Sequence, residues 1–160
     1  MKELFAMLPH ISPAEAHGQL LLDTCFIIYM LEEQQEKALL KHDCAILSFT
    51  AEELSFVEQH KIHDKSKVRL RHLLKQEHHL KIIDVDVHPG NPDQERSFVR
   101  SIEPGLLENI EDPSDAVLIA AAIRTQSNVL TRDKHHLYTS RLENFLNRYG
   151  IEVMNRFPDG

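Results

Sequence analysis

At 160 residues the chain is long enough to form one domain with a substantial hydrophobic core. Its composition, 42% hydrophobic and 27% charged, excludes a globally disordered chain. The formal net charge of −7 argues against a passive nucleic-acid-binding protein, which normally carries a basic balance.

The cysteines and the apolar stretches indicate the cellular compartment in which the protein is expected. Cys25 and Cys44 lie in apolar runs and lack CxxC spacing, so we expect buried thiols in a reducing environment. The apolar stretch Leu4–Leu8 is too short for a signal peptide, and no other stretch approaches the length of a membrane span. A cytoplasmic protein without membrane segments is therefore expected.

Residues 1–18 are expected to form an N-terminal extension, and residues 19–160 a single domain. In the extension, Ser12-Pro13-Ala14-Glu15 is a capping-box pattern that predicts a short helix. Apolar runs that do not alternate with polar residues predict strands at Leu20–Leu22, Ala45–Leu47, Lys81–Val85, Asn128–Leu130 and Ile151–Met154.

Helical patterns separate these runs. Helices are predicted at Phe26 to about Lys41, Ala51–Gln59, Ser66–Glu77, Pro113–Arg124 and Ser140–Tyr149, the last with Ser140 as its N-cap and Gly150 as its stop. Residues 88–112 are rich in Pro and Gly, and we expect a surface excursion that contains a helix from Asp93 to Ser101. The alternation of strand and helix predicts a doubly wound α/β sheet.

Four acidic residues are expected at one edge of this sheet. Asp23 ends the first run, Asp133 follows the fourth, Glu53 lies in the first turn of the helix after the second run, and Asp115 opens an apolar helix. In open α/β sheets, sites form outside the carboxyl ends of the strands. The four carboxylates are therefore predicted to meet there.

Each acid also has a purely structural interpretation. Asp23 is placed to be the N-cap of the helix that follows it, and Glu53 follows Thr50 at capping-box spacing. Asp115 lies three residues after Asp112, which is itself an expected N-cap. As a set, however, clustered carboxylates repel one another unless a cation offsets their charge.

Clusters of carboxylates alone favour hard divalent cations such as Mg²⁺ or Mn²⁺. A cation held in this way orients and activates a water molecule and neutralises charge that develops on a phosphodiester. Thr24 and Thr131 are candidate supporting residues, since their hydroxyls are placed either to hold a carboxylate or water or to bond the strand ends.

The segment from Lys61 to Lys75 carries six basic residues and one acid. It is interpreted either as a phosphate-binding strip or as a solvated helix face. The candidate RNA contacts are Lys61, Lys65, Arg69 and, beside the acidic edge, Arg132.

Four segments, in order, resemble the PIN-domain family, whose members include VapC-type toxins. They are LLLDTCFIIYML at 20–31, ILSFTAEELSFV at 46–57, SDAVLIAAAI at 114–123 and NVLTRDKHHL at 128–137. The resemblance implies a three-layer α/β/α fold with a central, mostly parallel sheet of about five strands, formed by residues 19–160.

The resemblance also implies cleavage of RNA by Mg²⁺- or Mn²⁺-activated water. The acidic ligands of the family fall on Asp23, Glu53, Asp115 and Asp133, with Thr131 as a supporting residue. Glu53 is preferred over Glu52 because Leu54 follows it. The implied partners are an RNA substrate, a second copy of the chain and, for a toxin, a small antitoxin. Two alternatives stay open, a PIN-like scaffold that binds RNA or protein without cutting, and an RNA-processing nuclease that is not a toxin.

Overall fold

The computed structural model describes residues 1–57, 59–132 and 139–158. Within these ranges, six strands form one sheet in the order β1-β4-β3-β2-β5-β6, and every neighbouring pair is parallel. The strands are β1 (His10–Ile11), β2 (Leu20–Leu22), β3 (Cys44–Leu47), β4 (Lys81–Ile83), β5 (Asn128–Leu130) and β6 (Val153–Met154).

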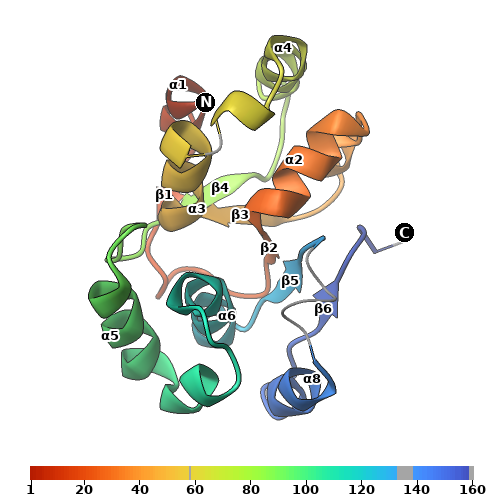
Figure 1. The fold of residues 1–160 in the computed structure, drawn as a ribbon. Coiled ribbons are helices and arrows are strands. Elements are labelled where there is room, and N and C mark those ends of the chain that lie inside the picture. The colour runs from red at the N-terminus through yellow and green to blue at the C-terminus, as the bar shows by residue number, and fades with distance from the viewer. Residues whose placement is uncertain (58, 133–138, 159–160) are drawn as a thin grey trace.

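Helices precede or connect the strands. The α-helices are α1 (Lys2–Ala6), α2 (Thr24–Glu32), α3 (Ser48–Glu52), α4 (Asp64–Leu73), α5 (Pro92–Ile102), α6 (Pro113–Thr125) and α8 (Ser140–Asn147). Shorter helical segments are the 3-10 helices η1 (Glu36–Leu40), η3 (Gln59–Lys61) and η4 (Pro104–Glu108), and the π-helical segment η2 (Glu53–Val57). Helices α1 to α4 lie on one face of the sheet and α5, α6 and α8 on the other (Figure 1). The expected three-layer α/β/α fold is confirmed.

Successive residues of each central strand point into two different cores. Leu21 and Val129 belong to the core on the side of α5, α6 and α8, whereas their neighbours Leu22 and Leu130 belong to the core beneath α2 and α4. Because both faces of the sheet are covered, both sets of side chains are apolar, which explains the continuous apolar runs. Burial of each such side chain stabilises the fold by roughly 1.5–3 kcal/mol.

The strand predictions hold, with two differences. The runs at 20–22 and 128–130 form β2 and β5 with the predicted bounds, β4 and β6 are shorter than their runs, and β3 begins one residue before its run, at Cys44. The sheet gains a sixth strand, because His10 and Ile11 of the N-terminal segment pair with Ile82 and Ile83 at its edge. A two-residue edge strand has no apolar run of its own for a sequence pattern to reveal.

The predicted helix at Ser12–Glu15 is wrong, and this segment forms a turn. Both the N–H and the Oγ of Ser12 donate to Glu15 Oε1, at 3.1 and 2.9 Å, so the capping bonds form without a helix behind them. The chain must reverse here to enter β2. Gly18, with a φ of +73°, completes the reversal.

Several predicted helices begin or end elsewhere, among them the one predicted at Ser66–Glu77, which is α4 at Asp64–Leu73. The pattern from Phe26 to Lys41 divides into α2 and η1, because Gln34 adopts a left-handed conformation with φ +53° and reverses the chain. The N-cap of α8 is Thr139 instead of Ser140, and its side chain accepts from the N–H of Leu142 at 3.3 Å. Gly150 follows with φ +70°, as a stop residue should.

The prediction that residues 88–112 form a surface excursion is also wrong. The predicted helix is present as α5, but Val99, Leu106 and Ile110 are buried in the core. Most polar residues of the segment are exposed, Glu95 being an exception, and they hide its apolar contribution from a composition-based interpretation.

Of the helices that the sequence predicted, α6 is the most deeply buried. Its residues 116–123 are all buried. Asp112 caps it by accepting from the N–H of Ser114 at 3.0 Å, and Pro113 occupies its first turn, where a missing N–H is tolerated. The helix is thus fixed at the end that carries Asp115. No helix in the described part of the chain is long and apolar enough to cross a membrane.

Candidate active site

Asp23 lies where β2 ends and α2 begins. Pairing of Leu22 with Leu130 places the next residues, Asp23 and Thr131, beside each other at the carboxyl edge of the sheet. Asp23 Oδ1 accepts from the N–H of Thr24 at 2.8 Å and caps α2. Asp23 Oδ2 accepts from Thr131 Oγ1 at 2.8 Å. The two oxygens of one carboxylate therefore serve a helix end and a site at the sheet edge.

Glu53 is joined to Asp23 through Thr24. The Oγ1 of Thr24 donates to Glu53 Oε1 at 3.0 Å, while its N–H donates to Asp23. One threonine thus orients two carboxylates that are 30 positions apart in the sequence. The supporting role predicted for Thr24 has a direct geometric basis in these two bonds, and Thr131 has one in its bond to Asp23.

The position of Glu53 differs from the expected one. Helix α3 begins at Ser48, with Leu47 as its N-cap, so Thr50 is inside the helix and forms no capping box. Glu53 is the first residue of the π-helical segment η2 instead of lying in a first turn. Segments of this kind occur frequently at functional sites. Of the adjacent glutamates, Glu52 pairs with His88 at 2.6 Å, so the two point to different partners.

Asp115 lies in the first turn of α6. Because only Gln126 and Ser127 separate α6 from β5, the helix runs antiparallel to that strand, and its N-terminus lies toward the carboxyl edge. The cap is supplied by Asp112, so the carboxylate of Asp115 is not required for it. Helix α5 steadies this end, since Ser114 Oγ donates to the buried Glu95 at 2.7 Å.

Cys25 is a residue of this site that sequence reasoning missed. Its Sγ is 3.3 Å from both Asp23 Oδ2 and Thr131 Oγ1, and it accepts from the N–H of Arg132 at 3.4 Å. Burial, followed by the charge of Asp23, raises the pKa of the Cys25 thiol to about 11. The raised pKa keeps the thiol neutral at physiological pH, and a neutral thiol is a poor nucleophile. Cys25 lies two residues after Asp23, in the first turn of a helix, and this position could have identified it as a site residue from the sequence.

The described residues bring part of the predicted set together. Asp23 and Glu53 are linked through Thr24, and Asp115 opens the helix that runs back from the same edge. Asp133 lies outside the described residues. Within residues 1–57, 59–132 and 139–158, no three or more His, Cys, Asp or Glu side chains group closely enough to hold a metal ion. The donor set nevertheless fits Mg²⁺ or Mn²⁺, since Mg²⁺ is usually held by one or two carboxylates together with waters.

A model of the PIN domain matches residues 20–142, which is more than half of the chain. The chain belongs to the PIN-domain family. PIN domains are generally nucleases and typically use divalent metals.

Among solved structures, the PIN chain is similar to FitAcB from Neisseria gonorrhoeae, with 20% sequence identity and a TM-score of 0.48. The match covers 85% of this chain and 96% of that one. No curated protein matches the chain at a significant level.

The candidate RNA contacts of this PIN domain fall into two groups, exposed lysines and arginines that are bonded within the fold. Lys61 and Lys65 are exposed. Arg69 holds the fold together, since its Nε donates to Glu36 at 2.6 Å and its terminal nitrogen donates to the carbonyl of Leu31 at 2.7 Å. That structural role was not anticipated from the sequence.

Arg132 is also held within the fold. Its guanidinium donates to the carbonyl of Asn155 at 2.9 Å and lies 3.9 Å from the ring centroid of Tyr29. These contacts orient the side chain next to the segment that carries Thr131 and Cys25. An RNA contact through Arg132 stays a prediction, as it does for Lys61, Lys65 and Arg69.

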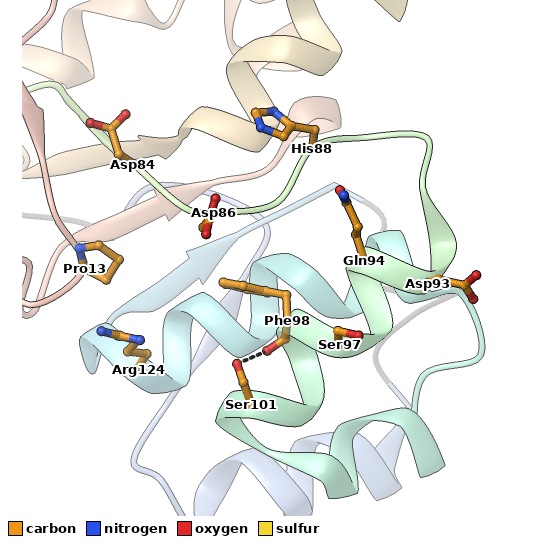
Figure 2. A pocket seen from close by; sticks show the side chains of 10 residues that line it. All are labelled: Pro13, Asp84, Asp86, His88, Asp93, Gln94, Ser97, Phe98, Ser101 and Arg124. Carbon is orange, nitrogen blue, oxygen red and sulfur yellow. Dashed lines mark hydrogen bonds between the residues drawn. The ribbon is translucent and has the colours of Figure 1, made fainter.

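A cavity of about 870 Å³ lies on another part of the PIN domain, between α5 and the segment that follows β4 (Figure 2). Asp84, Asp86 and Asp93 line it together with Arg124. Asp84 is paired with His10 at 2.8 Å. Asp23, Glu53 and Asp115 are not among the lining residues, so this cavity is separate from the acidic site.

Proposed function

We propose that the chain is a metal-dependent endoribonuclease that hydrolyses RNA phosphodiester bonds at the carboxyl edge of its sheet. Its acidic centre comprises Asp23, Glu53, Asp115 and Asp133. The observation that carries the proposal is the pair of bonds from Thr24, which orient Asp23 and Glu53 toward one edge in a chain of the PIN family. Membership of a nuclease family supports the reaction class, and the carboxylate donors support a hard divalent cation.

The residues of the chain prepare the site before substrate arrives. Thr131 holds Asp23 Oδ2, and Thr24 holds both Asp23 Oδ1 and Glu53, so neither carboxylate needs to reorganise when charge develops. Cys25 contributes a neutral, weakly polar wall. A bound Mg²⁺ or Mn²⁺ would supply an activated water and offset negative charge on the phosphodiester.

The decisive experiment measures cleavage of labelled single-stranded and hairpin RNA in Mg²⁺, in Mn²⁺ and in EDTA. We expect the wild-type chain to cleave with metal and not in EDTA. Asp115→Asn should reduce cleavage by more than the roughly 10- to 100-fold typical of losing a residue that only supports a metal site. The matched control is Asp112→Ser, which removes a neighbouring negative charge from the same helix end while keeping an N-cap side chain.

The outcomes separate the alternatives. Wild-type cleavage lost in Asp115→Asn but kept in Asp112→Ser supports the proposal. Cleavage at the wild-type rate by both Asp115→Asn and Asp112→Ser would identify a contaminating nuclease. RNA binding without metal-dependent cleavage by the wild type would establish the non-catalytic scaffold instead.

The proposal extends to partners through the family. For a toxin member, a small antitoxin would neutralise the nuclease, and the active form would be a homodimer. Light scattering on the purified chain distinguishes a dimer from a monomer. Co-expression with the product of a small neighbouring gene, followed by the cleavage assay, distinguishes a toxin from an RNA-processing nuclease.

A further inference from the structure

The outer face of α8 carries a set of side chains that the acidic centre does not use. Arg141, Asn144, Phe145 and Arg148 recur at the spacing that places residues on one side of a helix. The opposite side carries Leu142 and Leu146, which are buried in the core. The face is therefore fixed in direction by the packing of its own helix.

These four residues line a cavity of about 320 Å³ together with Glu108 and Asn109 from the end of η4. The walls are rigid for identifiable reasons. Asn109 Nδ2 donates to the carbonyl of Gly105 at 2.9 Å, and the hydroxyl of Tyr149 bonds Glu103. Phe145 packs against the core and lies 5.7 Å from the ring of Tyr149.

Both arginines have their guanidinium groups at the surface. Arg141 and Arg148 are exposed, and Arg148 lies over the ring of Phe145 with 5.7 Å to its centroid. Among the described residues neither arginine forms an ion pair within 4.0 Å, although Arg148 lies close enough to Glu103 for their charges to interact. A chain of net charge −7 thus presents two exposed guanidiniums on one face, with the carboxylates of Glu103 and Glu108 nearby.

The location connects this face to the acidic centre. Helix α8 leads from β5 to β6, which are parallel, so it runs antiparallel to them and begins toward the carboxyl edge. Arg141 is its second residue. On the other wall, Asn109 lies only a few residues before Asp112 and Asp115. One wall of the cavity is therefore the helix that begins toward the carboxyl edge, and the other wall is the segment that leads to Asp115.

We propose that this face binds the single-stranded RNA that flanks the cleaved bond, an inference that rests on the proposed ribonuclease function. Arg141 and Arg148 bind phosphates, for which the planar guanidinium is suited. Their separation of seven residues corresponds to ~10 Å along the helix, about the length of three stacked nucleotides. Phe145 offers a surface for base stacking, and the amides of Asn109 and Asn144 with the carboxylate of Glu108 offer partners for base edges.

An acidic peptide is a less suitable occupant. Glu108 lines the cavity and would repel it, whereas the same carboxylate can accept from the amino groups of a base. An aromatic ring beside two arginines and two amides matches recognition of an unpaired nucleotide more closely than recognition of an acidic side chain.

The test measures binding of a fluorescein-labelled 12-nucleotide single-stranded RNA by anisotropy, in EDTA to prevent metal-dependent cleavage. The variants are Arg141→Gln with Arg148→Gln combined, and Asn144→Asp, which adds a negative charge to the same face. We expect each to weaken binding at least tenfold. The double variant should also flatten the salt dependence of log K by about 1.4, since each phosphate contact on a single strand contributes about 0.7.

The matched control is Arg100→Gln, an exposed arginine on α5 outside this cavity, which should bind within twofold of the wild type. Wild-type affinity and salt slope in the double variant would overturn the inference. A polyglutamate peptide that displaces the RNA at equal charge concentration would reassign the face to an acidic protein partner.

Cleavage by the same proteins separates the two proposals. If the wild type cleaves RNA and the double variant both binds and cleaves equally well, the α8 inference fails and the nuclease proposal stands. If the wild type neither binds nor cleaves any RNA, both fail. If the double variant loses binding while the wild type binds without cutting, the RNA face is retained and the nuclease proposal fails.

Discussion

Asp23 combines a structural and a functional position in one carboxylate. Its Oδ1 caps α2 through the N–H of Thr24, and its Oδ2 lies at the sheet edge beside Thr131 and Cys25. The sequence offered these as alternative interpretations, a cap or a member of an acidic cluster. They are compatible because a carboxylate has two oxygens that face different directions.

Cys25 provides a test at the residue scale. With a pKa of about 11, its thiol should react with iodoacetamide slowly at pH 7.5, at least tenfold more slowly than a free cysteine with a pKa of about 8.5. Because the thiolate is the reactive form, the rate should rise about tenfold per pH unit up to pH 9.5. Mass spectrometry of the alkylated peptide gives the rate, and Cys44→Ala removes the other, buried thiol.

The raised pKa of Cys25 also determines how the stability of the folded state changes with pH. A thiol whose pKa is raised on folding favours the folded state while it is neutral, below about pH 8.5. That contribution declines as the pH rises from about 8.5 toward 11, because the unfolded thiol ionises first. A labelling rate that levels off below pH 9 would contradict the raised pKa of the partly buried Cys25 thiol.

At the scale of elements, Arg69 joins three segments on one side of the sheet. It contacts Glu36 in η1, the carbonyl of Leu31 at the end of α2, and Ser66 in its own helix α4. Glu36 is buried, and its Oε2 has no hydrogen-bond partner among the described residues. The ion pair is therefore what makes burial of this carboxylate tolerable.

We predict that Arg69→Met destabilises the chain by about 2–4 kcal/mol, because it leaves the charge of Glu36 buried without a partner. This is below the range for a fully buried pair, since the Arg69 side chain is 33% exposed. Urea denaturation measures the change. The double variant Arg69→Met with Glu36→Leu should recover most of it, because the orphaned charge is gone.

The matched control is Lys65→Met, an exposed cation on the same helix, which should change stability by less than about 0.5 kcal/mol. Equal losses of stability in Arg69→Met and Lys65→Met would mean that Arg69 contributes only a positive charge and no specific bond to Glu36. A loss of RNA binding in an Arg69 variant is informative only after its stability has been measured.

At the scale of the whole molecule, the net charge of −7 gains a physical interpretation. Acidic residues gather near one edge of the sheet, and proximity of like charges reduces stability until a cation offsets them. Two exposed arginines, Arg141 on α8 and Arg148 at its C-cap, line a cavity on the outer face of that helix. This distribution is what our two proposals require, a cation at the acidic edge and a polyanion along α8.

We therefore predict that Mn²⁺ stabilises the folded chain. At a concentration 100 times Kd the stabilisation is about 2.7 kcal/mol, which raises Tm by roughly 5–11 °C for a domain of this size. Asp115→Asn and Glu53→Gln should each reduce the shift by more than half. Differential scanning calorimetry in EDTA and in Mn²⁺ measures it.

Asp112→Ser is the matched control, with a shift equal to that of the wild type. Identical Mn²⁺ shifts in the wild type and in both acidic variants would place the metal elsewhere on the molecule.

Periodicity and chain order predicted much of the architecture. Unbroken apolar runs predicted strands covered on both faces, and their alternation with helices predicted a parallel sheet. Asp23 at the end of β2 and Asp115 at the start of α6 followed from those elements, because parallel strands bring their carboxyl ends to one edge. These features depend on residues close together in the sequence, which the sequence alone can specify.

Contacts between distant residues were decided only by the tertiary structure. The bond of Thr131 to Asp23, the bridge from Thr24 to Glu53 and the pairing of Arg69 with Glu36 join residues at least 29 positions apart. A hydrogen bond requires donor and acceptor within about 3 Å, and local patterns carry no information on which distant side chains meet that condition. The sequence by itself determined five of the six described strands, most of the helices and the edge at which Asp23 and Asp115 are placed. Packing of those elements determined which oxygens face each other there.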